Sequence, residues 1–300
     1  MERALLHPRH WPAWVGFGLI RIASFLPTPT LFRFGRLLGR LALPLARSRA
    51  RIARRNLELC FPEMDDPQRQ QLLRAHFESL GISMLETPLA WWGSDRRVDS
   101  LGSISGIEHL EDAVAEGRGV LLLSAHFTSL EISGRFLLKY AEFDAMYRPS
   151  NNPVVEYLMA RARARHSGGL IARDDVKKLI RRLRAGHVVW YAPDQNTKRT
   201  KGVFVRFFGH QASTTPATHR LARMTGARVV PFKAVRKTDD SGYQLTLEPA
   251  LDAFPTEDVE ADTQRVNDII ERWVREHPDQ YLWIHRRFRT RPNRSDPRIY

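Results

Sequence analysis

From about residue 100 onward, short apolar runs alternate with amphipathic helical patterns. Residues 119–124 form an apolar run after a glycine, as expected for a strand that is buried on both faces. Residues 187–192 and 227–232 repeat that pattern further along the chain. Strands that alternate with helices usually pair in parallel, so the sequence predicts an α/β fold with a mostly parallel central sheet flanked by helices.

Helices and a turn can be placed between these strands. One helix follows the first strand and carries its apolar residues on one side from Leu130 onward. Another begins near Val176, repeats apolar residues at intervals of three and four, and ends at Gly186. Residues 239–242 are typical of a hairpin turn that leads into a strand over 243–247.

The net charge of +14 is concentrated at the amino terminus. Residues 1–55 hold eleven arginines and a single acidic residue, Glu2, which gives that segment a charge of +10. Such an excess indicates an anionic partner, either phospholipid or nucleic acid. Because the same segment is rich in Trp, Phe and Leu, we expect it to bind the anionic lipid of a membrane, and we expect no nucleic-acid partner.

Residues 11–32 form the first helical pattern within this basic segment. They contain a single charge, Arg21, and are long enough for a membrane-spanning helix, which needs about 20 apolar residues. Arg21 near the middle disfavours insertion. A spanning helix and a helix that lies in the membrane interface therefore both stay open.

Residues 31–45 give a clearer amphipathic pattern. On a helical wheel the apolar residues gather on one side and three arginines on the other, as in a helix that lies on anionic lipid. The alternative is a basic surface helix that packs its leucines on the protein. We predict membrane-associated helices over residues 1–55 and a catalytic domain over 56–300. The apolar set is Leu31, Phe34, Leu38, Leu41 and Leu45, and the arginines are Arg33, Arg36 and Arg40.

The strongest candidate for chemistry is His126, just past the carboxyl end of the strand predicted over 119–124. Open α/β sheets place their sites at that edge. Glu131 follows five residues later, where its carboxylate would orient the imidazole and stabilise the imidazolium, so that the pair can take a proton from an alcohol. The spacing alone is weakly specific. No second histidine or carboxylate stands at ligand spacing, so we predict no metal site.

Several longer stretches carry a family resemblance. His126 and Glu131 look like the His-x4-Asp/Glu motif of glycerolipid acyltransferases in the lysophospholipid acyltransferase superfamily. More specifically, the chain resembles the lipid A biosynthesis lauroyl acyltransferase family of Gram-negative bacteria, nearly from end to end. The matching stretches are residues 5–9 (LLHPR), 56–64 (NLELCFPEM), 147–149 (YRP), 190–194 (WYAPD), 221–224 (LARM) and 281–288 (YLWIHRRF).

The resemblance implies roles for particular residues and partners. It implies that His126 is the base, that Glu131 is its partner, and that acyl-carrier protein is the acyl donor. It also implies a glycolipid acceptor that bears a free hydroxyl. Arg148 and Asp194 lie in matching stretches and are expected to bind substrate, because an arginine suits a phosphate or a developing oxyanion. The alternatives are a structural ion pair for Arg148 and an acidic loop cap for Asp194.

The predicted function is transfer of a fatty acyl chain, such as lauroyl, from acyl-carrier protein to a hydroxyl of a lipid A precursor. The predicted location is the inner membrane, with the catalytic domain on the cytoplasmic side, and no cofactor is expected because the thioester stores the free energy of ester formation. The alternatives are another glycolipid or a lysophospholipid as acceptor, or an acyl-carrier-protein thioesterase. Basic clusters at Arg161, Arg163 and Arg165 and at residues 177–184 are candidates for docking the acidic carrier, with solvated helix faces as the alternative.

Overall fold

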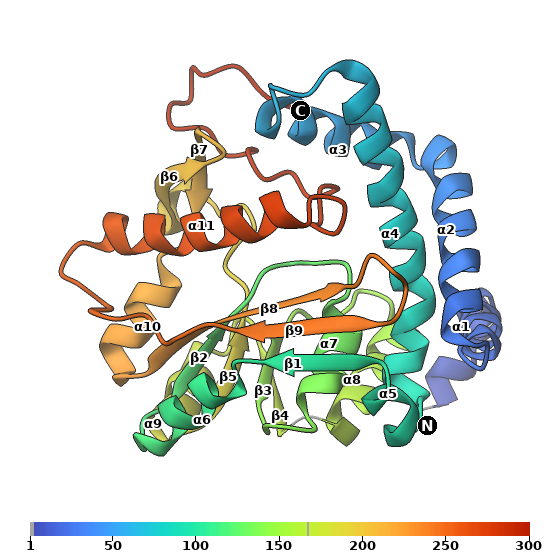
Figure 1. Ribbon diagram of the computed structural model, residues 1–300, viewed down its shortest axis with the longest axis horizontal. Helices are drawn as coiled ribbons and strands as arrows, with labels where there is room; N and C mark the ends of the chain where they lie inside the picture. The colour runs from blue at the N-terminus through green and yellow to red at the C-terminus, as the bar shows by residue number, and fades with distance from the viewer. Residues whose placement is uncertain (1–2, 167) are drawn as a thin grey trace.

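A computed structural model describes residues 3–166 and 168–300 of the chain. Seven strands form a central sheet in the order β1–β9–β8–β2–β5–β3–β4 (Figure 1). Neighbouring strands from β8 to β4 are parallel, whereas β9 runs antiparallel to β8. The predicted mostly parallel sheet is therefore confirmed. The strands are β1 (Gly102–Ser105), β2 (Val120–Leu123), β3 (Asp144–Tyr147), β4 (Gly169–Ala172), β5 (Val188–Tyr191), β8 (Arg228–Arg236) and β9 (Tyr243–Leu247).

Both faces of the sheet are covered by helices. Leu121 and Leu123 of β2 enter one core with side chains of α9, α10 and α11, while Val120 and Leu122 enter a second core with α6, α7 and α8. Because successive residues of a strand point to opposite faces, two covered faces require an uninterrupted apolar strand. These helices are α6 (Ile107–Ala115), α7 (Leu130–Leu137), α8 (Pro153–His166), α9 (Val176–Arg184), α10 (Ala217–Thr225) and α11 (Val259–Glu276).

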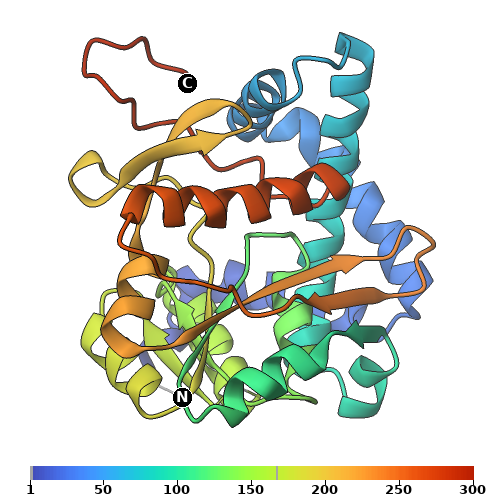
Figure 2. The ribbon, with the colours of Figure 1, turned by 60° about the vertical axis from the view of Figure 1, so that its left-hand side comes forward.

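The long helix α4 (Asp66–Trp92) carries the amino-terminal helices on its outer side (Figures 1 and 2). Helix α2 (Thr28–Leu45) packs closely on it, because glycines stand where the two backbones meet. A β-carbon at Gly39 would collide with the carbonyl of Phe77, and one at Gly81 would collide with the carbonyl of Gly35. The short helix α5 (Asp95–Asp99) follows α4.

Helices α1 (Trp11–Ala23) and α2 leave apolar side chains exposed on their outer sides. Leu45 is 83% exposed and Ile22 is 68% exposed, and a set of such residues on neighbouring helices is more informative than a single one. Among the described residues, no helix has the length and hydropathy needed to cross a membrane. The exposed set is Trp11, Val15, Leu19 and Ile22 on α1 and Phe34, Leu37, Leu38, Leu41 and Leu45 on α2.

The structure corrects two details of the amphipathic prediction for residues 31–45. Leu31 is fully buried in the core and does not belong to the exposed apolar side. Two of the three arginines are paired within the protein: Arg36 with Asp240, and Arg40 Nε with Glu78 Oε1 at 2.7 Å. Helix α2 therefore uses one side to pack on α4 and presents the remaining apolar residues outward.

The predicted boundary after residue 55 falls inside helix α3 (Arg47–Cys60), whose Ala53 and Leu57 are buried in the main core. The amino-terminal helices thus pack against the sheet domain at this point. Residues 1–2 of the predicted membrane-associated segment lie outside the described residues.

Two further elements lie near the carboxyl edge of the sheet. Strands β6 (Val203–Phe207) and β7 (His210–Thr214) form a separate antiparallel pair that packs beside α11. After α11 the chain returns across the edge, where Phe127 and Tyr281 form an isolated antiparallel bridge. This return brings residues 281–288 next to the loop that follows β2.

Candidate active site

His126 lies in the loop between β2 and α7, at the carboxyl edge of the sheet. Both polar groups of its backbone are hydrogen-bonded. Its amide donates to Oδ2 of Asp194 at 3.1 Å, and its carbonyl accepts from the amide of Leu282 at 3.0 Å. The amide of Thr128 also donates to the carbonyl of Gln280 at 2.8 Å. The carboxyl-terminal segment therefore fixes the loop that carries the imidazole.

The carboxylate that binds the imidazole of His126 belongs to Asp194, not to Glu131 as predicted. Nδ1 of His126 lies 2.6 Å from Oδ1 of Asp194. An ionised carboxylate only accepts hydrogen bonds, so Nδ1 carries the proton and Nε2 of the neutral ring keeps its lone pair. The side chain of Asp194 is 2% exposed and that of His126 is 29% exposed. The edge of the ring that carries Nε2 is therefore free of this bond.

The sheet topology explains this pairing. Strands β2 and β5 are parallel neighbours, and the amide of Ser124 donates to the carbonyl of Tyr191 at 2.9 Å just beyond their last paired residues. The residues that follow the two strands therefore emerge side by side. Asp194, which the sequence analysis expected to bind substrate, instead hydrogen-bonds to the histidine.

Burial and charge act against each other on this pair. Burial alone would lower the pKa of His126, but the charge and hydrogen bond of Asp194 outweigh it and raise the pKa above 6.5. Burial would likewise raise the pKa of Asp194, but the charge and hydrogen bonds of His126 lower it to about 2. Asp194 thus stays ionised, and its charge favours the protonated form of His126, as suits an imidazole that takes up a proton.

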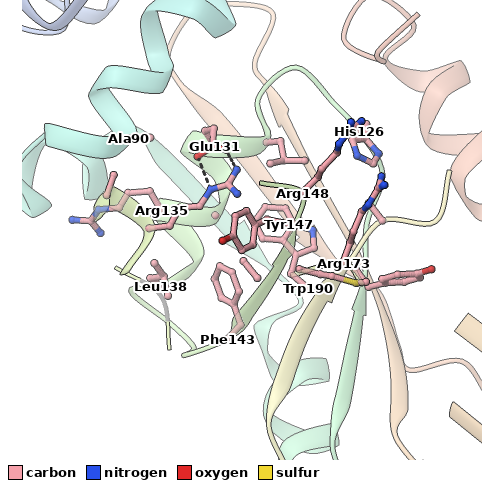
Figure 3. A pocket seen from close by; sticks show the side chains of 18 of the residues that line it. Ala90, His126, Glu131, Arg135, Leu138, Phe143, Tyr147, Arg148, Arg173 and Trp190 are labelled. Atoms are coloured by element: carbon pink, nitrogen blue, oxygen red, sulfur yellow. Dashed lines mark hydrogen bonds and ion pairs between the residues drawn. The ribbon is translucent and has the colours of Figure 1, made fainter. Parts of the chain in front are cut away.

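Glu131 lies in the first turn of α7 and binds other partners. Its carboxylate forms an ion pair with Arg163 of α8 and accepts a hydrogen bond of 3.0 Å from Nε1 of Trp91 on α4. Figure 3 shows Glu131 on the side of the pocket away from His126. Glu131 therefore links three helices around the pocket.

A pocket of about 330 Å³ opens beside His126, within the size range of small-ligand sites. Its inner part is apolar and is lined by Leu138, Phe143 and Trp190 (Figure 3). A β-carbon at Gly134 would lie 2.6 Å from Cζ3 of Trp190, so only glycine leaves that ring in place. This part of the pocket therefore offers an apolar surface that leads towards the imidazole.

Arg148 and Arg173 line the same pocket and extend to the end where His126 lies (Figure 3). Arg148 follows β3 and Arg173 follows β4, so the same edge of the sheet supplies both. The pocket therefore combines an apolar interior with a basic mouth. Arg148 was predicted from the sequence. Arg173 was not, because β4 had no recognisable apolar run to mark the residue that follows it.

No group of three His, Cys, Asp or Glu side chains in residues 3–166 and 168–300 could hold a metal ion. His285, the second histidine near the site, accepts a hydrogen bond of 3.0 Å at Nε2 from the amide of Asn196. Burial lowers the pKa of His285 to about 4, so this ring stays neutral. It braces the loop after Asp194.

Comparison with known proteins identifies the family. The sequence profile named "Bacterial lipid A biosynthesis acyltransferase" matches residues 1–290. The chain belongs to this family. The chain is therefore an O-acyltransferase of lipid A biosynthesis, which acts on a glycolipid acceptor.

Similar members of the lipid A acyltransferase family are found in Escherichia coli. The lipid A biosynthesis lauroyltransferase is 42% identical over 96% of this chain and 95% of its own length. The palmitoleoyltransferase is 39% identical over 97% of this chain and 95% of its own length, and the myristoyltransferase is 31% identical over 97% and 90%. A solved 1-acyl-sn-glycerophosphate acyltransferase from Thermotoga maritima matches 81% of this chain and 97% of its own length, with a TM-score of 0.40 and 15% identity.

The two basic clusters of this lipid A acyltransferase differ in their surroundings. On α8, Arg163 binds Glu131 in the pocket, whereas Arg161 and Arg165 line a second cavity. On α9, Arg182 Nε lies 2.6 Å from Oδ2 of the buried Asp144, and Lys178 donates to the carbonyl of Leu170. The α8 cluster is therefore divided between two cavities, and part of the α9 cluster is engaged within the fold.

Proposed function

We propose that this chain transfers a fatty acyl group from acyl-carrier protein to a hydroxyl of a lipid A precursor. The observation that carries the proposal is the hydrogen-bonded pair of His126 and Asp194 at the mouth of an apolar pocket. The inner pocket would hold the acyl chain, with the thioester carbonyl beside Nε2 of His126. A chain of about lauroyl length is the expected donor.

The reaction follows from the state of the imidazole. Neutral Nε2 takes the proton of the acceptor hydroxyl as its oxygen attacks the thioester carbonyl. The tetrahedral oxyanion collapses, the carbon–sulfur bond breaks, and the imidazolium returns the proton to the leaving thiolate. Asp194 stabilises the imidazolium and holds the ring in the required tautomer. The ester forms at the expense of the thioester, so no ATP and no cofactor enter the balance.

The two arginines at the mouth of the pocket would bind the negatively charged groups in this reaction. Arg148 and Arg173 are placed to stabilise the oxyanion or to bind the phosphate that links the acyl chain's carrier group to its protein. Exposed basic residues on α9, among them Lys177 and Arg181, would add attraction for the acidic carrier protein.

The outer sides of α1 and α2 would place the enzyme on its acceptor. Their exposed apolar residues and the basic amino terminus fit a helix pair that lies in the interface of an anionic membrane. We propose that these helices bind the inner membrane. The catalytic domain would then lie on the cytoplasmic side, because acyl-carrier protein is delivered from there.

The test is the product formed by the purified protein. Given acyl-carrier-protein thioester and a tetra-acylated lipid A precursor in micelles, it should yield a lipid heavier by one acyl group, and the reaction should survive EDTA. His126→Ala should keep less than about a tenth of the wild-type kcat, given the usual contribution of a general base. Free fatty acid as the only product, with acceptor in excess, would support a thioesterase instead. Acylation of lysophospholipid but not of the precursor would support the other acceptor class.

A further inference from the structure

A second cavity, of about 520 Å³, lies beside the pocket that contains His126. It is bounded by α1, the carboxyl end of α4 and α8. Trp91 and Ala162 line both cavities, so a single layer of side chains separates them. The residues that line the second cavity are Trp14, Arg21, Trp91, Trp92, Gly93, Tyr157, Leu158, Arg161, Ala162 and Arg165.

This cavity is strongly basic. Arg21, Arg161 and Arg165 line it, and no acidic residue is among the described residues of its wall. The guanidinium of Arg21 lies 5.0 Å from the centre of the Trp92 ring, and Arg161 donates to the hydroxyl of Tyr157 at 3.5 Å, a long hydrogen bond. No carboxylate in the described part of the chain pairs with any of the three. Their charge is therefore left for a ligand.

Neighbouring arginines show the contrast. Arg163, between Arg161 and Arg165 on α8, pairs with Glu131, and Arg135 pairs with Asp95. These two arginines thus form ion pairs within the protein, unlike the three that line the second cavity. Three guanidinium groups around one aromatic-walled hollow match the oxygens of a phosphate, which an arginine can bind through two parallel hydrogen bonds.

The position of the second cavity limits the kinds of phosphate-bearing ligand that can reach it. Helix α1 forms one wall through Trp14 and Arg21, and its opposite side exposes Val15, Leu19 and Ile22. The cavity therefore lies next to the apolar surface that we assign to the membrane interface. A phosphate here belongs to an amphiphile whose chains stay in the apolar layer and whose head extends towards the catalytic pocket.

We propose that the second cavity binds a phosphate monoester on the headgroup of the glycolipid acceptor. This inference rests on the proposed function and adds a binding site to it. Binding on one side of Trp91 would hold the headgroup while the acceptor hydroxyl reaches Nε2 of His126 on the other side. The anionic phosphate of a bilayer phospholipid has the same chemistry, so the test must separate the two sources.

The test compares wild type with Arg161→Gln/Arg165→Gln, in micelles of uncharged detergent. Each variant receives the phosphorylated acceptor and the same acceptor after enzymatic removal of its phosphates. We expect the double variant to raise KM for the phosphorylated acceptor about ten- to hundredfold, because each charge-assisted hydrogen bond is worth about a factor of ten. Its kcat should change little. With the dephosphorylated acceptor, wild type and double variant should show the same raised KM.

Two controls complete the test. Arg220→Gln, an exposed arginine of α10 that lines neither cavity, should leave both KM values unchanged. Binding without turnover is measured in the His126→Ala background from the fluorescence of the tryptophans in the cavity wall. There the midpoint for the phosphorylated acceptor should rise with the same double substitution. This readout separates failure of the site from failure of the proposed activity, since it requires no product.

The results of these experiments decide whether the second cavity binds the acceptor phosphate or a bilayer phospholipid. An unchanged KM and an unchanged binding midpoint in the double variant would overturn the proposal. An equal loss with both acceptors would show that the arginines do not recognise phosphate. If the double variant loses binding only to vesicles that contain phosphatidate, while the acceptor KM in micelles is unchanged, the cavity binds bilayer phospholipid and the proposal is wrong.

Discussion

At the scale of single residues, the two carboxylates near the histidine have different tasks. Asp194 touches the imidazole and sets its pKa and tautomer, whereas Glu131 pairs with Arg163 and Trp91. Asp194 follows the end of β5 by three residues, whereas Glu131 lies in the first turn of α7. The distinction leads to two variants, of which only one should change the pH dependence.

Asp194→Asn should move the acid limb of the pH profile. Asp194 raises the pKa of His126 above 6.5, and the proposed mechanism uses the neutral imidazole as the base. In wild type, activity is therefore lost as pH falls through a value above 6.5. Without the negative charge, burial dominates and the pKa falls, so the acid limb of kcat/KM should shift to lower pH while kcat drops by about 10²–10⁴-fold. A limb that stays in place would show that another group controls it.

Glu131→Gln should leave that limb unchanged. The glutamine can still accept from Trp91 but cannot neutralise Arg163, whose side chain is largely covered. Loss of this pair should lower the free energy of unfolding by about 1.5–3 kcal/mol, the usual range for a hydrogen bond to a charged group. The profile of kcat/KM and a urea titration measure the two effects. A shift of the acid limb would instead indicate that Glu131 acts on His126 during turnover.

At the scale of elements, the sequence predicted what local patterns specify. The apolar runs of β2, β5 and β8, the helices α7 and α9 and the turn before β9 are all confirmed. The short strands β3 and β4 were missed, because four partly buried residues carry too little alternation to be recognised. The partner of His126 was also missed. Asp194 is 68 residues away in sequence, and only the pairing of β5 with β2 brings it close.

The contact between α2 and α4 gives a prediction for stability. Gly39→Ala should lower the free energy of unfolding by about 1–3 kcal/mol, because the added carbon meets the rigid carbonyl of Phe77 and must push the helices apart. Gly16→Ala on α1 is the matched control, since nothing lies within 4 Å of its added carbon. That control should be neutral or slightly stabilising. Urea unfolding of both variants measures the difference, and equal midpoints would contradict the close contact.

At the scale of the whole molecule, the sheet, the helices and the charge place the reaction at a surface. The amino-terminal helices lie on the outer side of α4, opposite the sheet (Figure 1). The catalytic pocket and the basic second cavity both reach α4 through Trp91. If the proposed membrane surface is correct, an amphiphile that enters beside α1 would meet both cavities next to that surface.

The outer sides of α1 and α2 give the corresponding prediction. Combining Val15→Gln, Leu19→Gln, Leu41→Gln and Leu45→Gln should lower partition onto lipid vesicles by at least about a hundredfold, since burial of each such side chain contributes roughly 1 kcal/mol or more. Val176→Gln with Met224→Gln is the control, because both residues are 46% exposed but lie on α9 and α10. Co-sedimentation with vesicles measures the partition.

The arginines of α2 refine the same experiment. Arg36 and Arg40 are engaged by Asp240 and Glu78, so only Arg33 of the three is free to attract anionic lipid. Arg33→Gln should weaken binding to anionic vesicles at low salt by about fivefold, because one basic residue near such a surface contributes about 1 kcal/mol. Arg36→Gln should have a smaller effect on binding and instead weaken the contact with Asp240. Equal losses of binding for Arg33→Gln and Arg36→Gln would mean that the ion pair between Arg36 and Asp240 opens at the membrane. Unchanged binding of the fourfold apolar variant would mean that the protein binds lipid through another face.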